Sequence, residues 1–271
     1  MSLLHGGVAI AVGIVFVLPV LWAFLGSLRE TGELSARTMP LLPSPIVWDN
    51  YRTIFEVVDV RRFIGNSLLV AAVAVPTTVV VASMAGFAMS QVSQRWRLRL
   101  ISLSVICLMV PLTAIWLPRF ILFKEAGLIN ERMALAVPAL MGTSPLYALL
   151  FLWAFLRVPR EIYEAAKIDG AGLYRVWGQI ALPLARPVVF AVAVLSFVHY
   201  WNSFVEPLLL IRTTDQMTAS LGLRVLYSLD RTNWPLLMTG AVLLTAPVIL
   251  IFLAAQRVFQ QDAQGRGIVG Q

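Results

Sequence analysis

Six long stretches of the chain contain no Asp, Glu, Lys or Arg. They run from Gly6 to Leu28, Phe63 to Gln94, Leu100 to Pro118, Met133 to Leu156, Pro187 to Val205 and Thr232 to Gln256. A helix needs about 20 residues, at a rise of about 1.5 Å each, to cross about 30 Å of hydrocarbon. We therefore expect an all-α membrane protein with six transmembrane helices, at about 6–28, 66–90, 100–121, 133–156, 187–209 and 234–256.

The segment 158–183 lies between the fourth and fifth stretches and is too charged to cross a bilayer. Its charged residues include Arg160, Lys167, Asp169 and Arg175. At about 3 kcal/mol each near the membrane centre, they would cost on the order of 12 kcal/mol as an upper figure. Pro159 suits a helix start, and Gly170 suits the left-handed residue that ends one. The sequence predicts a helix-turn-helix loop outside the membrane.

The two halves of this loop carry different surfaces. After the turn, an apolar stripe at helical spacing could pack under the bundle, and Pro183 is expected to end that helix. The stripe consists of Leu173, Val176, Trp177 and Ile180. Before the turn, Ile162, Ala165 and Ala166 form a small-residue face beside Glu164. The residues alone leave two interpretations open: a docking surface for another protein, or an ordinary amphipathic loop.

Composition excludes several classes of protein. Hydrophobic residues make up 59% of the 271 residues, charged residues 13%, and mean hydropathy is +0.82. A soluble enzyme of this length needs far more charged surface. The net charge of +7 comes from scattered Lys and Arg, which argues against nucleic-acid binding. One cysteine, Cys107, excludes an intrachain disulfide, and with only two histidines no metal site is expected.

The distribution of basic residues indicates the orientation. With six spans, both termini share one side with Ser90–Arg99 and segment 157–186, and these loops and the tail hold 10 Lys or Arg against 4 acids. The positive-inside rule favours the cytoplasm for this set. We expect a single transmembrane domain over residues 1–271, with both termini cytoplasmic.

The loop also carries a recognisable motif. Glu164-Ala165-Ala166, three residues, Gly170, nine residues, Ile180, one residue and Leu182-Pro183 match the EAA loop of ABC importer permeases. The IDGA string at 168–171 resembles more narrowly the carbohydrate permeases similar to the second membrane subunit of the maltose transporter. PSPIVWDNYRTIF at 43–55, Asn66-Ser67 and WNSF at 201–204 resemble other family segments. Ser203 replaces the usual acid there, and the tail lacks the family's common lysine.

The resemblance implies an importer assembled from several chains. Its partners would be a second permease forming a heterodimer, two copies of an ATP-binding subunit and an extracytoplasmic solute-binding protein, in a bacterial or archaeal cytoplasmic membrane. The chain has no G-x-x-x-x-G-K-[ST] motif. It is therefore expected to be no enzyme and to bind no cofactor, with ATP and Mg held by the partner ATPase. The resemblance assigns ATPase coupling to Glu164, Ala165, Ala166, Asp169 and Gly170, and the loop's fold to Ile180, Leu182 and Pro183.

Residues near the outer end of the fifth stretch are candidates for the solute pathway. Ionisable groups at membrane depth, together with aromatic and hydrogen-bonding groups, suit a sugar. They are Asn202, Glu206, Trp201 and His199. Interfacial or interhelical roles are the alternative for Trp201 and His199. Arg119 and Lys124 are expected to reach lipid headgroups.

Three alternative functions remain at this stage. The first is an importer permease for a phosphorylated polyol or other polar solute. The second is a stand-alone ion-coupled secondary transporter, although the six stretches contain none of the acids on which that class relies. The third is a membrane-embedded enzyme, which is disfavoured because no nucleophile, base and orienting group can be placed together.

Overall fold

The protein is built from helices and connecting loops. A computed structural model describes residues 2–33 and 40–267, and these residues contain no β-strand. The predicted all-α class is therefore confirmed. The end of the glycine-rich tail, residues 268–271, lies outside the described residues.

The chain folds into two compact units. Unit 1 comprises Met1–Asn66 and Met217–Leu250, and unit 2 comprises Ser67–Gln216 and Ile251–Gln271. Helices α3 (Val60–Gln91) and α13 (Trp234–Gly267) contribute to both units.

Unit 1 contains α1 (Ser2–Ser27), α2 (Asn50–Val57), α12 (Ala219–Leu229) and the first parts of α3 and α13. Its core is a cluster formed by Ile54, Val60, Leu226 and Leu236. The end of α1 meets the start of α13, where the Thr239 hydroxyl donates to the Ser27 carbonyl over 3.3 Å. These helices are thus fixed by both apolar packing and hydrogen bonds.

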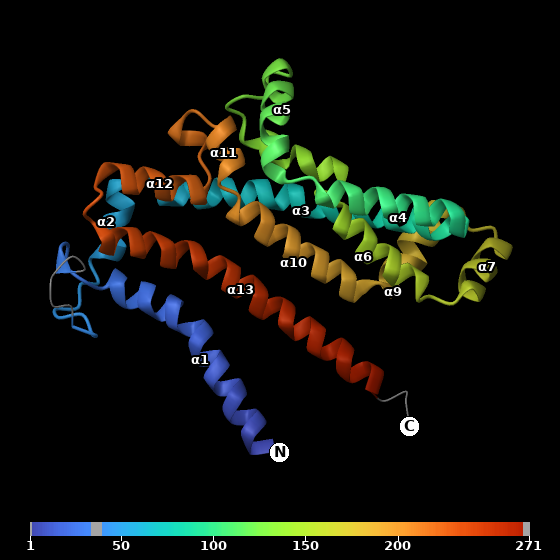
Figure 1. Cartoon of the computed structure of the whole chain (residues 1–271), viewed down its shortest axis with the longest axis horizontal. Coiled ribbons are helices and arrows are strands. Elements are labelled where there is room, and N and C mark those ends of the chain that lie inside the picture. The colour runs from blue at the N-terminus through green and yellow to red at the C-terminus, as the bar shows by residue number, and fades with distance from the viewer. Residues whose placement is uncertain (1, 34–39, 268–271) are drawn as a thin grey trace. The chain divides into compact units, whose positions relative to one another are not determined.

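Unit 2 contains the remaining helices, which are shown in Figure 1. In chain order they are α4 (Gln94–Met109), α5 (Leu112–Glu125), the 3₁₀ helix η2 (Arg132–Met141), α6 (Pro145–Leu156), α7 (Arg160–Ile168), α8 (Leu173–Arg175), the π-helix η3 (Val176–Ala181), α9 (Leu182–Leu184), α10 (Arg186–Asn202), α11 (Val205–Leu210) and the short 3₁₀ turn η4 (Thr214–Gln216). α6 packs against both α4 and α10. α7 lies at one end of this group, and α5 and α11 lie toward the other (Figure 1).

Not every predicted span is one straight helix. Among the described residues, Val60–Gln91 and Trp234–Ala254 are each long and apolar enough to cross a membrane. Three further pairs reach that length only when combined across a bend: α4 with α5 at 90°, η2 with α6 at 41°, and Leu173–Leu184 with α10 at 85°. α1 is a continuous apolar helix of 26 residues. The count of six spans therefore stays a prediction.

Prolines affect the helices in two ways. Pro19, Pro76 and Pro247 lie inside continuous helices. Pro111 instead separates α4 from α5, because it lacks the amide hydrogen and holds the preceding Val110 in an extended conformation. The stretch predicted as one helix at 100–121 is consequently two helices.

Candidate functional site

The inner face of α7 is anchored to the helices beside it. Tyr163 and Ala166 are buried in a core cluster that includes Phe87 of α3 and Phe155 of α6. The Tyr163 ring meets the Phe87 ring edge-on at 6.1 Å, and its hydroxyl donates to the Phe155 carbonyl over 3.3 Å. Burial raises the pKa of the Tyr163 hydroxyl above its ordinary value. α7 is therefore held against α3 and α6.

The turn after α7 has the geometry predicted for Gly170. Its φ is +74°, in the left-handed region that favours glycine. The Gly170 amide donates to the Lys167 carbonyl over 3.0 Å, and the Ala171 amide donates to the Ala166 carbonyl over 2.9 Å. This pair of bonds is a Schellman motif, with Asp169 as the exposed C-cap. Gly170 thus sets the direction in which the chain leaves α7.

The small residues of α7 divide between an exposed face and a buried face. Glu164 and Ala165 are exposed, as a docking face requires. Ala166 is only 7% exposed, because it lies three positions after Tyr163 and shares its buried side. Ala166 therefore packs inside its own chain, and its contact with a partner's groove stays a prediction.

The second half of the loop packs against the end of the helix bundle. Val176 is buried, and Trp177, Ile180 and Leu182 pack against the same cluster as Tyr163. The Trp177 indole N–H donates to the Ser83 hydroxyl over 3.3 Å. Of the predicted stripe, Leu173 is exposed. The helix ends at Leu184, one residue after Pro183, and the chain bends by 85° before α10.

The candidate solute residues separate into different environments. Trp201 is buried and stacks on Phe197 with ring centres 5.4 Å apart, which removes its ring from a solute's reach. His199 is half-buried and meets the Tyr200 ring edge-on. Asn202, the last residue of α10, is exposed. Of the four candidates, Asn202 is thus the one available at a helix end.

Glu206 is engaged with a residue that we expected to reach lipid. It forms a half-buried ion pair with Arg119, which joins α11 to α5. The expectation that the Arg119 side chain extends to lipid headgroups is therefore wrong here, since a partially buried carboxylate satisfies it. In this structure, Glu206 positions α11.

Two groups of polar contacts in unit 2 were missed by sequence reasoning. The hydroxyls of Thr78, Thr143 and Tyr200 form a chain with oxygen separations of 2.6 and 2.7 Å. Thr143 has a φ of +61° at the bend between η2 and α6. The Asn130 side-chain oxygen accepts from the amides of Arg212 and Thr213 at 2.9 Å each. The position of these polar residues beside apolar stretches was a signal that they form hydrogen bonds. The sequence did not identify their partners, because these lie 57 or more positions away.

A buried arginine organises the loop after α1 in unit 1. Arg29 is 1% exposed, pairs with Glu33 at 2.6 Å and donates to the carbonyls of Pro40 and Leu41 at 2.6 and 3.0 Å. The Asn50 amide donates to the carbonyls of Ser27 and Arg29. Asn50 falls in the segment 43–55 singled out from the sequence, whereas Arg29 was missed.

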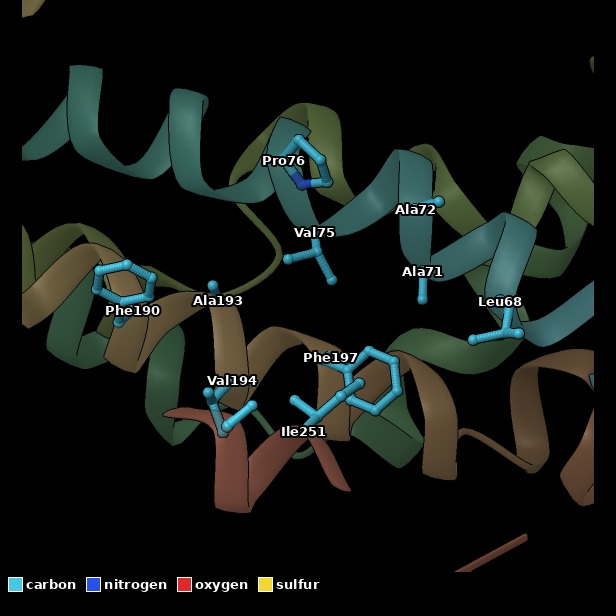
Figure 2. Close-up of a pocket in the computed structure, with 11 residues that line it drawn as sticks. Leu68, Ala71, Ala72, Val75, Pro76, Phe190, Ala193, Val194, Phe197 and Ile251 are labelled. Atoms are coloured by element: carbon cyan, nitrogen blue, oxygen red, sulfur yellow. The ribbon is translucent and has the colours of Figure 1, made fainter. Parts of the chain in front are cut away.

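Unit 2 also contains an apolar cavity of about 510 Å³, shown in Figure 2. Its walls come from α3, α10 and α13, and the residues are Leu68, Ala71, Ala72, Val75, Pro76, Phe190, Ala193, Val194, Phe197, Ile251 and Ala254. None of these side chains can hydrogen-bond to a sugar hydroxyl. The cavity is therefore unsuited to recognising a polyhydroxylated solute.

These features define an all-helical membrane protein with a two-faced helix-turn-helix loop. The chain belongs to the family of binding-protein-dependent transport system inner membrane components, whose model matches residues 65–264.

Named relatives cover nearly the whole chain. The arabinooligosaccharides transport system permease protein AraQ of Halalkalibacterium halodurans is 30% identical over 96% of this chain and 93% of its own length. The sn-glycerol-3-phosphate transport system permease protein UgpE of Brucella abortus is 29% identical over 95% and 94%. The fold matches a chain of a bacterial ABC transporter involved in the import of the acidic polysaccharide alginate, with a TM-score of 0.75, 18% identity and coverage of 95% of this chain and 96% of that one.

Proposed function

We propose that the chain is one permease subunit of an ATP-driven importer that translocates a carbohydrate delivered by an extracytoplasmic binding protein. The family is defined by binding-protein-dependent transport, and one relative named above serves arabinooligosaccharides. A second permease would complete the pathway as a heterodimer, and two copies of a separate ATP-binding subunit would supply the energy. Both termini and segment 158–183 would lie in the cytoplasm.

The observation that carries this proposal is the two-faced construction of α7. Its inner face, through Tyr163, is locked to α3 and α6, while Glu164 and Ala165 are exposed on the outside. A partner that grips the outer face must therefore move the ends of α3 and α6 together with α7. We infer that closure of the ATPase pair on ATP shifts these helices and alternates access to the pathway. Glu164 would contact an ATPase arginine, and Ala165 would fit the groove beside it.

The two substitutions that test this mechanism are Ala165→Trp and Gly170→Pro. A tryptophan at the exposed Ala165 would fill the partner's groove, whereas proline at Gly170 cannot adopt φ +74° and removes the amide that bonds to Lys167. Both variants should insert into the membrane and lose ATP-driven uptake by at least about tenfold. Ala165→Ser is the matched control, because it keeps the small volume. Normal uptake by Ala165→Trp would refute the assignment.

A second cargo is favoured by one specific observation. A relative that covers nearly the whole chain is an sn-glycerol-3-phosphate permease. Stimulation of ATPase activity in the assembled transporter, with binding proteins loaded with sugars or with sugar phosphates, separates the two cargoes. Stimulation by neutral sugars supports the carbohydrate proposal, and stimulation only by phosphorylated polyols replaces it.

A further inference from the structure

A polar hollow lies beside α7, on the side that faces the turn between α3 and α4. It has a volume of about 410 Å³. The α3–α4 turn lines one wall and α7 the other, and residues at the end of α6 also line it. The lining residues are Ser90, Gln91, Val92, Ser93, Gln94, Arg97, Phe155, Leu156, Val158, Arg160, Tyr163, Glu164 and Lys167. The hollow therefore joins the coupling helix to a second, separate element.

The two walls of this hollow are held at a fixed spacing. Phe87, near the end of α3, packs edge-on against both Phe155 of α6 and Tyr163 of α7, at 5.7 and 6.1 Å. Arg97 of α4 donates to the carbonyls of Met89, Ser90 and Val92 at 3.1, 2.8 and 3.1 Å. These bonds fix α4 to the end of α3. Because both walls belong to one packed cluster, the hollow exists before any partner arrives.

The charges in the hollow fit a polypeptide that carries an acidic side chain. Arg97 is already committed to backbone carbonyls, whereas Arg160 and Lys167 are exposed, with no ion pair or side-chain hydrogen bond between them and other described residues. The Ser93 hydroxyl and the Gln94 side-chain amide can both donate and accept, as a peptide backbone requires. Glu164 is the single carboxylate among the lining residues, so the two exposed cations leave the hollow with a net positive charge.

We propose that this hollow is a second docking site for the ATP-binding subunit, which grips the α3–α4 turn together with α7. The inference rests on the proposed function, and it names a contact outside the coupling loop. An acidic loop of the ATPase would enter the hollow and reach Arg160 and Lys167. Force would then pass into α3 and α4 directly, as well as through α7.

Site-directed photo-cross-linking tests this proposal in the assembled transporter. Cys107 is the sole cysteine, so Cys107→Ser gives a cysteine-free background. Ser93→Cys places a benzophenone maleimide label in the hollow, Ala165→Cys places it on the outer face of α7, and Arg95→Cys is an exposed control that does not line the hollow. A cross-link is assigned to the ATP-binding subunit when the captured protein is the one that azido-ATP labels.

The outcomes separate this proposal from the proposed function. Cross-linking of Ser93→Cys to the ATP-binding subunit, several-fold above Arg95→Cys, supports the second docking site. If Ala165→Cys cross-links but Ser93→Cys stays at the control level or captures phospholipid, the second site is refuted and the proposed function stands. If neither Ala165→Cys nor Ser93→Cys reaches that subunit, both are refuted.

A charge reversal supplies an independent measurement. Lys167→Glu should lower ATP-driven uptake by about tenfold, because it replaces a charge-assisted contact with repulsion. Lys167→Arg should retain uptake. Arg157→Glu is the matched control, since Arg157 is exposed near the same end of α6 but outside the hollow. Equal uptake by Lys167→Glu and Arg157→Glu would refute the acidic contact.

Discussion

At the scale of single residues, two glycines occupy positions that a larger residue would not tolerate, one because of its backbone conformation and one because of a neighbouring helix. Gly170 is required by its φ of +74°, and its position could be predicted from the spacing of the loop motif. Gly86 is required for another reason. A Cβ there would lie 2.6 Å from the Phe151 Cβ, 2.7 Å from the Ala148 carbonyl oxygen and 2.8 Å from the Leu152 amide nitrogen. α3 and α6 therefore touch backbone to backbone.

Gly86→Ala should destabilise the protein because backbone atoms of α6 cannot move aside as a flexible side chain could. We expect a loss of about 1–3 kcal/mol, measured as the shift of the unfolding midpoint in detergent. Gly65→Ala in the same helix is the control, since nothing lies within 4 Å of its added Cβ. That change should be neutral or stabilise by up to about 1 kcal/mol. Equal midpoints for the two variants would contradict the close crossing.

The residues also indicate what sequence can and cannot predict. The spacing from Glu164 to Pro183 located the loop, its turn and its buried second half. It did not assign Ala166 to the inner face, because Ala165 and Ala166 are adjacent small residues. The pattern does not specify where the exposed face of α7 ends and the buried face begins. Asn130, Thr143 and Arg29 were missed because their partners depend on how distant segments pack.

At the scale of elements, the end of unit 2 away from α7 is fixed by contacts between short helices. The ion pair of Arg119 and Glu206 joins α5 to α11, and Asn130 holds the chain directly after α11. The spans predicted at 100–121 and 187–209 did not include these short helices. Hydropathy does not detect the breaks in the helices at Pro111 or between Asn202 and Val205.

Breaking this ion pair should destabilise the junction of α5 and α11. The side chains of Arg119 and Glu206 are 24% and 14% exposed, so the cost lies between that of a surface pair and a buried one. Glu206→Gln should lower stability by about 1–3 kcal/mol, measured by thermal unfolding in detergent. The exchanged pair Arg119→Glu with Glu206→Arg should recover part of that loss. Unchanged stability of Glu206→Gln would show that the contact contributes nothing.

At the scale of the whole molecule, the account requires α7 to face the cytoplasm. In the cysteine-free background, Ala165→Cys should react with a membrane-impermeant maleimide in inverted vesicles and stay unlabelled in intact cells. The exposure of Ala165 makes the reaction fast once the reagent reaches that side. Labelling in intact cells would place the loop outside and reverse the predicted orientation.

Uptake by reconstituted vesicles tests the central claim most directly. The complete transporter, with ATP supplied on the side of α7 and loaded binding protein on the other, should accumulate the solute. The chain reconstituted alone should accumulate none, with ATP or with a proton gradient. Gradient-driven uptake by the chain alone would contradict the account and identify a stand-alone secondary transporter.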